Sequence, residues 1–179
     1  TALPLTDPNI YALYLLNAIV GGSSSSRLFQ EVREKRGLAY SVYSYHSAYR
    51  NAGSFGVYAG VSPRMVDSTL DLVVGLLTEL GQQGVSEEEL TEAREQLKGQ
   101  MMLGLESTSS RMSRLGRGEL TRGFVYSPDE VIARVDAVTL EQVNELAHRL
   151  FVEECRVLAA VVPHTMQHDF TRYGEVLHD

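Results

Sequence analysis

Arg33 and Tyr40 are the residues of this 179-residue chain whose types and spacing most directly fit a chemical role. They lie seven residues apart, on either side of a predicted junction between a helix and a strand. Both side chains donate hydrogen bonds, so together they could hold one substrate. The pair equally fits structural roles, since arginines favour helix ends and tyrosines are often half-buried at strand starts. The residue types alone leave both interpretations open.

Candidates for metal binding are few. Neither H-x-x-E-H nor H-E-x-x-H occurs in the sequence, which excludes a zinc peptidase centre of either type from this chain. The close pair His164 and His168 has the spacing of helical metal ligands, but Pro163 disfavours a helix and no glutamate lies between them. His46 fits an exposed strand face and His148 an ordinary helix position. We therefore expect no metal site in this chain.

Residues 21–26 consist of two glycines and four serines before a predicted helix. Such a segment can present amide and hydroxyl donors to an anion. It lacks the G-x-x-x-x-G-K-[ST] and G-x-G-x-x-G motifs, however, and no strand precedes it. We favour a connection between two helices in which Ser25 or Ser26 caps the second one, and an anion-binding loop is the alternative.

A basic cluster lies in a serine-rich segment, and its members are Arg111, Arg114, Arg117 and Arg122. The three-residue spacing of the first two places them on one face of a helix. Ion pairs with Glu106, Glu119 or another acidic surface are the simplest interpretation of the cluster. Contact with an acidic partner or peptide is the alternative.

The composition argues against several classes of partner. Sixteen basic and 23 acidic residues give a net charge of −7, which repels nucleic-acid phosphates and anionic lipid headgroups. No apolar run approaches the roughly 20 residues of a membrane span, so we expect a soluble protein. One cysteine, Cys155, excludes an internal disulfide. Because it begins a predicted buried strand, packing is a better interpretation than a nucleophilic role.

Helical periodicity and capping patterns predict most of the chain to be helical. Asp7 is the predicted N-cap of a first helix that ends at Gly21, and a second helix is predicted over residues 27–36. Later N-terminal signatures, three of them capping-box patterns, predict further helices. These helices are predicted to start at Ser62, Ser86, Ser127 and Thr139.

Two strands should form a hairpin. From Tyr40 the period changes to two, which places Tyr40 on the same strand face as Val42. Turn residues at 50–53 and renewed alternation over 54–61 predict an antiparallel partner. A closing strand is predicted at about 156–162, where the chain is strongly apolar.

The order of these elements lacks the βαβ alternation of a doubly wound fold. We predict an α+β domain with a mostly antiparallel sheet and helices packed on one face of it. Residues 1–163 should form this single domain, and the tail 164–179 stays unassigned. Because two hairpin strands and one late strand make a thin sheet, we also expect a further strand before residue 1.

Beyond these patterns, the sequence resembles a known family. Residues 25–42 read S-S-R-L-F-Q-E-V-R-E-K-R-G-L-A-Y-S-V, and residues 105–112 read L-E-S-T-S-S-R-M. With A-G at 59–60 and E-E-E-L at 87–90, they resemble the carboxy-terminal domain of the pitrilysin/insulinase-like zinc metallopeptidases, especially the bacterial branch similar to processing peptidases. The resemblance covers roughly residues 6–163.

This resemblance implies two homologous domains that enclose a chamber in which peptides or precursor segments are cleaved. The amino-terminal domain binds the zinc through H-x-x-E-H, and the carboxy-terminal domain usually lacks that motif. The chain is therefore expected to be a non-catalytic, substrate-binding domain, inactive alone and without a cofactor of its own. Arg33 and Tyr40 match the arginine and tyrosine that reach across to the zinc site in the family.

The expected partners follow from the same resemblance. They are a peptide substrate and a zinc-bearing amino-terminal domain, either in the same polypeptide or in a partner subunit of a homo- or heterodimer. Nucleic acid and membranes are not expected partners, and the expected compartment is the bacterial cytoplasm. The alternative function is that of a structural or assembly domain in an inactive family member.

Overall fold

The computed structural model describes residues 1–151, 156–163, 169–173, 175 and 176. Cys155, His164 and His168 lie outside the described residues. The helices are α1 (Ile10–Val20), a π-helix (Phe29–Glu34), a 3-10 turn (Pro63–Met65), α2 (Val66–Gln83), α3 (Glu87–Gly104), α4 (Thr108–Arg122), α5 (Pro128–Asp136), α6 (Leu140–Leu150) and a second 3-10 turn (Thr171–Tyr173). The strands are β1 (Ala39–Ala48), β2 (Gly53–Val61), β3 (Val157–Leu158) and β4 (Glu175–Val176). None of these helices combines the length and hydropathy that crossing a membrane requires.

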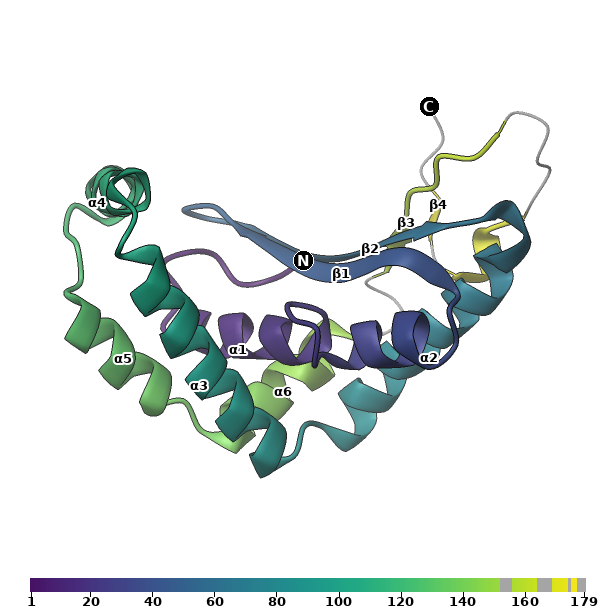
Figure 1. The fold of residues 1–179 in the computed structure, drawn as a ribbon, viewed down its shortest axis with the longest axis horizontal. Helices are drawn as coiled ribbons and strands as arrows, with labels where there is room; N and C mark the ends of the chain where they lie inside the picture. Colours follow the sequence, from purple (N-terminus) through teal and green to yellow (C-terminus); the bar gives the residue numbers. More distant parts are fainter. Residues whose placement is uncertain (152–155, 164–168, 174, 177–179) are drawn as a thin grey trace.

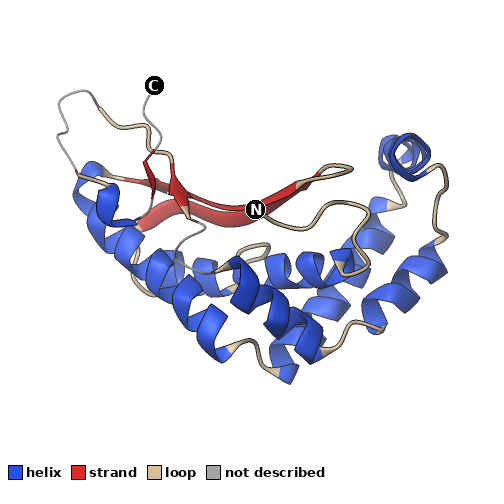
Figure 2. Cartoon of the chain, turned by 180° about the vertical axis from the view of Figure 1, so that it is seen from behind, coloured by secondary structure: helices blue, strands red, loops and turns tan. Residues whose placement is uncertain are grey.

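The hairpin and the helices form two layers, which confirms the predicted α+β class with helices on one face of an antiparallel sheet. Strands β1 and β2 pair antiparallel, and helices α1, α3, α5 and α6 lie below them in Figure 1, with the reverse side shown in Figure 2. Helix α1 contacts β1 on one side and α3, α5 and α6 on the other. Its leucines Leu13, Leu15 and Leu16 are completely buried, so α1 is the centre of the hydrophobic core.

The late strand differs from the prediction in length and pairing. Only Val157–Leu158 is a strand, and it pairs in parallel with Glu175–Val176 in a separate two-stranded sheet. Val161, at the end of the predicted strand, is fully exposed. The prediction that residues 156–162 extend the hairpin sheet is therefore wrong for the described residues. An apolar run indicates strand propensity, but its pairing depends on which strand edge lies within reach.

Local capping signals proved reliable where they form a complete box. The hydroxyls of Ser86, Ser127 and Thr139 accept the N–H three residues later, and the side chain at that later position accepts the cap N–H in return. The prediction for Asp7 was wrong, because α1 begins at Ile10. The Asp7 carboxylate instead accepts the Asn9 N–H at 2.8 Å, which makes a turn just before the helix.

The Arg27–Glu89 pair joins the segment before β1 to the start of α3. Arg27 Nε and a terminal nitrogen donate to the two Glu89 oxygens at 2.6 and 2.8 Å. One of these oxygens also accepts the Ser86 N–H at 2.8 Å, which completes the capping box. Hydrogen bonds from Arg27, and then from Ser86, lower the pKa of Glu89 below its ordinary value.

Replacing Glu89 by glutamine should lower the free energy of unfolding by about 2 kcal/mol at pH 7, because a charge-assisted bidentate pair becomes a neutral contact. The carboxylate titrates at a lower pH in the folded state, so its contribution is present above the unfolded pKa of about 4.3 and disappears as pH falls through the folded pKa. Urea unfolding at pH 7 and pH 3 measures the difference. The exposed control Glu92→Gln should change little, and equal losses for Glu89→Gln at both pH values would contradict the assignment.

His46 does not lie on an exposed strand face as predicted, because its ring packs against Tyr14 at a centroid distance of 4.8 Å. Its Nδ1 is buried and has no hydrogen-bond partner. Burial lowers the pKa of His46 below 6.5. The unfolded chain therefore binds the proton more tightly than the folded chain does.

The folded state should consequently lose stability as the pH falls below about 6.5, because protonation of His46 favours unfolding. The variant His46→Phe keeps an aromatic ring against Tyr14 and removes the titrating group. Urea unfolding at pH 7.5 and 5.5 should show a smaller pH-dependent loss in His46→Phe than in the wild type. The same loss in both proteins would show that burial of His46 does not affect stability.

Candidate functional site

The structure brings Arg33 and Tyr40 together. Arg33 lies in the last turn of the π-helix, and Tyr40 is the second residue of β1. The guanidinium carbon of Arg33 lies 5.9 Å from the Tyr40 ring centroid and 4.9 Å from that of Phe29. Tyr40 is 88% exposed, and Arg33 is exposed as well. The two donors therefore share one accessible surface.

The helix that carries Arg33 differs from the predicted regular helix over residues 27–36. Residues Phe29–Glu34 are a π-helix, in which the Lys35 N–H donates to the Gln30 carbonyl at 2.9 Å. Gly37 then adopts φ +59°, a left-handed conformation that glycine reaches without strain. This wider turn sets the direction of Arg33, and π-helical segments occur frequently at functional sites.

Tyr40 owes its exposure to a β-bulge. Ala39 pairs with Val61, but the next paired residue is Ser41, opposite Gly60, so Tyr40 is the extra residue. The bulge interrupts the alternation of side chains and places Tyr40 off the buried face. Val42 is only 5% exposed, and the prediction that Tyr40 shares its strand face was therefore wrong.

The charged residues around the π-helix pair with one another and leave Arg33 out. Glu31 accepts from Lys35 at 2.5 Å and from Arg36, and these hydrogen bonds lower the pKa of Glu31. Among the described residues, no carboxylate lies within 4.0 Å of the Arg33 guanidinium. The N–H groups of Arg33 are therefore available to a ligand.

Further tyrosines line the uncovered face of the hairpin. Tyr43 stacks on Tyr58 at a centroid distance of 5.1 Å, and Tyr45 lies 6.2 Å from Tyr43. Each of the three is between 44% and 48% exposed. Tyr58 was missed as a surface residue in the sequence, although the alternation that turns Val57 toward the core already places Tyr58 on the outer face.

In the segment 21–26, the glycine N–H groups and the neighbouring Arg27 are already engaged within the protein. The N–H groups of its two glycines both donate to the Asn17 carbonyl, at 3.0 and 2.9 Å. Arg27 is occupied by Glu89 and by a terminal-nitrogen bond of 3.2 Å to the Gly84 carbonyl. These bonds support the interpretation of a helix-to-helix connection. The predicted serine cap does not form, because the Ser25 hydroxyl pairs with that of Ser23 and the Ser26 hydroxyl donates to the Ser23 carbonyl.

His148, the remaining histidine considered as a metal ligand, makes a structural contact. His148 Nδ1 lies 3.0 Å from the Gly81 carbonyl oxygen, which joins α6 to α2. Within the described ranges, no group of three or more histidine, cysteine, aspartate or glutamate side chains could hold a metal ion. A zinc site therefore does not fit the described part of this chain.

The arginines of α4 do not make the predicted ion pairs. Over the described ranges, no carboxylate lies within 4.0 Å of Arg111, Arg117 or Arg122. Arg114 donates to the backbone carbonyl of Tyr126. Pairing with Glu106 or Glu119 is thus absent, and the alternative of an acidic ligand is still open.

Comparisons with known proteins agree with this fold. A family described as "Peptidase M16 inactive domain" matches residues 1–97. The chain is 47% identical over 161 residues to an uncharacterized zinc protease, YmxG, of Bacillus subtilis, covering 90% of this chain and 39% of the relative. It is 46% identical over 145 residues to the uncharacterized zinc protease SCO5738 of Streptomyces coelicolor, covering 81% of this chain and 32% of the relative.

A solved structure gives the same result. The peptidase M16 inactive domain from Pseudomonas fluorescens superposes with a TM-score of 0.74 at 29% identity, covering 83% of this chain and 36% of that one. The chain thus spans between about a third and two fifths of the length of these proteins. The predicted resemblance to the non-zinc domain of the metallopeptidases is confirmed, since the chain belongs to the peptidase M16 inactive-domain family.

Proposed function

We propose that this chain is the substrate-binding, non-catalytic domain of a zinc-dependent endopeptidase, in which Arg33 and Tyr40 hold the peptide backbone. The observation that carries the proposal is the exposed pair itself. Two donors from adjacent elements lie beside each other, and no described carboxylate occupies the arginine. Because both side chains are exposed, their donors can exchange water for a peptide ligand without breaking a contact inside the protein.

Each residue has a separate role in the proposed site. The Tyr40 hydroxyl donates to the carbonyl oxygen of the bond to be cleaved, where negative charge grows during the attack of water. The Arg33 guanidinium offers several N–H donors in a planar fork and binds a neighbouring carbonyl of the same peptide. Phe29 limits the movement of that guanidinium by packing against its face.

The metal would come from a different domain. The two curated relatives are named zinc proteases and are much longer than this chain, which leaves room for a zinc-bearing domain in the whole protein. The described residues do not form a metal site. We therefore place the zinc on an amino-terminal domain of the same polypeptide or on a partner subunit, with the peptide bound between the two domains.

Photo-crosslinking tests the proposed position of the peptide independently of the rate of cleavage. A photoreactive phenylalanine analogue at position 40 should crosslink a labelled, unstructured peptide when the chain is combined with a zinc-bearing domain. The matched control carries the analogue at Leu103, which is 68% exposed on α3. Equal crosslinking at both positions, or none at position 40, would contradict the proposal and favour a structural or assembly role.

A further inference from the structure

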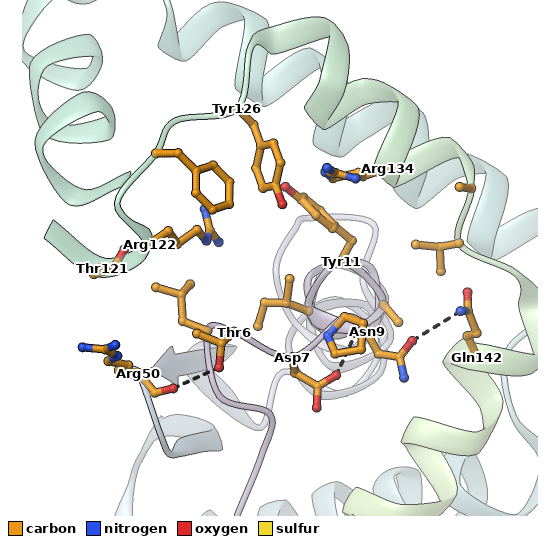
Figure 3. A pocket seen from close by; sticks show the side chains of 17 residues that line it. Thr6, Asp7, Asn9, Tyr11, Arg50, Thr121, Arg122, Tyr126, Arg134 and Gln142 are labelled. Atoms are coloured by element: carbon orange, nitrogen blue, oxygen red, sulfur yellow. Dashed lines mark hydrogen bonds between the residues drawn. The ribbon is translucent and has the colours of Figure 1, made fainter. Parts of the chain in front are cut away.

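A cavity of about 570 Å³ lies between the start of α1, the end of α4 and α5 (Figure 3). Tyr11 enters it from α1, Arg122 from the last residue of α4, Tyr126 from the loop that follows, and Arg134 from α5. A second cavity of about 440 Å³ shares Arg122 and Tyr126 with the first. Three of the α4 arginines, Arg114, Arg117 and Arg122, therefore border one or both of these neighbouring cavities.

Hydrogen-bond donors converge in this cavity. Figure 3 shows the hydroxyl groups of Tyr11 and Tyr126 between the guanidinium groups of Arg122 and Arg134. The Arg134 guanidinium carbon lies 3.9 Å from the Tyr126 ring centroid, and that of Arg122 lies 5.7 Å from it. Burial raises the pKa of Tyr11 above its ordinary value of 10, against the opposing charges of the two arginines, so its hydroxyl stays protonated at neutral pH.

Neither guanidinium is neutralised by this part of the chain. Among the described residues, no carboxylate lies within 4.0 Å of Arg122 or Arg134. Glu130 is one turn before Arg134, but its carboxylate is held by the backbone of the α5 capping box at 2.7 Å. Asp7 borders the cavity, and its carboxylate accepts a backbone N–H two residues later. Glu130 therefore acts on Arg134 only as a nearby charge. Arg122 interacts with the Tyr14 side chain, so neither guanidinium forms an ion pair within the described residues.

A structural explanation accounts for only part of this arrangement. Arg122 and Arg134 lie in the last turns of their helices, where a cation interacts favourably with the helix dipole. Both also pack against the Tyr126 ring. Stacking uses the flat face of a guanidinium and leaves its N–H edge available for a carboxylate. Helix-end and stacking interactions therefore fix the position of the arginines without using most of their donors.

We propose that this cavity binds a carboxylate group of a peptide, through the guanidinium groups of Arg122 and Arg134 and the hydroxyls of Tyr11 and Tyr126. The carboxylate is either the carboxy terminus of the peptide or an acidic side chain. That the ligand is a peptide rests on the function proposed above. The basic character of the cavity stands independently of that function.

This site is separate from the Arg33–Tyr40 pair. Tyr40 lies at the start of β1, whereas Arg50, which borders the cavity, follows the end of that strand. Ten strand residues at roughly 3.3 Å each separate the two ends by about 30 Å. A variant at one site should therefore leave the other site intact.

Titration calorimetry on the 179-residue chain tests the carboxylate site with three acetylated hexapeptides. One has a free carboxy terminus and no acidic side chain, one is amidated with two glutamates, and one is amidated and neutral. At least one of the carboxylate peptides should bind and the neutral peptide should not, and the difference between the first two identifies the source of the carboxylate. Binding of inorganic phosphate without either carboxylate peptide, or binding of all three peptides alike, would overturn the proposal.

Variants of single arginines provide the decisive comparison. Arg122→Gln and Arg134→Gln should each weaken carboxylate binding about tenfold, because each removes a charged donor. The control Arg64→Gln removes the same charge from an exposed position outside the cavity and should change the affinity less than twofold. If Arg122→Gln fails to fold in a thermal scan, Tyr11→Phe, which removes only a hydroxyl, should still weaken binding. Wild-type affinity in both arginine variants would overturn the site.

The two proposals fail in different ways. Arg33→Ala should leave unchanged the difference in affinity between the carboxylate peptides and the neutral peptide, because that difference arises in the cavity. Loss of crosslinking at position 40 with intact carboxylate binding would refute only the role of the Arg33–Tyr40 pair. Crosslinking without any carboxylate binding would refute only the cavity site.

Discussion

Replacing Tyr40 by phenylalanine should lower kcat for peptide cleavage about 100-fold when the chain is combined with a zinc-bearing domain. Loss of one hydrogen bond to a developing oxyanion costs roughly 3 kcal/mol in comparable sites, which corresponds to this factor. KM should change little, because the bond strengthens mainly in the transition state. Steady-state kinetics with a fluorogenic peptide would measure both constants.

The free energy of unfolding should be nearly unchanged in Tyr40→Phe. Tyr40 is 88% exposed, so removal of its hydroxyl should change the free energy of unfolding by less than about 0.5 kcal/mol. Tyr49→Phe is a matched control, because Tyr49 is 70% exposed and follows the other end of β1. An equal fall in kcat for Tyr49→Phe, or an unchanged kcat for Tyr40→Phe, would contradict the role assigned to the Tyr40 hydroxyl.

Gly21→Ala should destabilise the fold by about 3 kcal/mol, at the upper end of typical overpacking costs. A Cβ at position 21 would lie 2.3 Å from the Ser44 backbone nitrogen and 2.8 Å from its hydroxyl oxygen. The Ser44 N–H also donates to the Gly21 carbonyl at 3.1 Å, so this contact joins the end of α1 to the middle of β1. An added methyl group would force these two backbones apart. Urea unfolding monitored by circular dichroism measures the loss.

Gly75→Ala is the control for this substitution. Gly75 lies inside α2, and a Cβ there would meet no atom within 4 Å. Alanine is the better helix former, so this variant should gain about 0.5–1 kcal/mol. A gain for Gly75→Ala with no loss for Gly21→Ala would show that the contact between α1 and β1 adjusts without cost.

Elements specified by neighbouring residues could be predicted from the sequence. The capping boxes at Ser86, Ser127 and Thr139 need only two side chains three residues apart, and they form as expected. The hairpin follows from alternation on both sides of a short turn. Features that insert a residue into a regular element escaped this reasoning. The bulge at Tyr40 and the π-helix around Arg33 each shift a side chain without changing the hydrophobic pattern.

Features that depend on distant parts of the chain were also predicted poorly. The apolar run after Arg156 indicated a strand, but its pairing with Glu175–Val176 is a long-range choice. Sequence spacing could not show whether the α4 arginines form ion pairs. Glu119 and Arg122 are three residues apart in the sequence, yet their side chains do not pair. Arg134 was not considered at all, since it comes near Arg122 only through the Tyr126 ring, which lies between the two guanidinium groups in the folded chain (Figure 3).

The kcat/KM of Arg33→Ala, Tyr40→Phe and the double variant, measured together with a zinc-bearing domain, tests the central claim most directly. If both residues hold one peptide, each single variant should lose activity, and the double variant should lose less than the product of the two factors, because contacting residues are coupled. Wild-type kcat/KM in both single variants would contradict the claim that this pair binds the substrate.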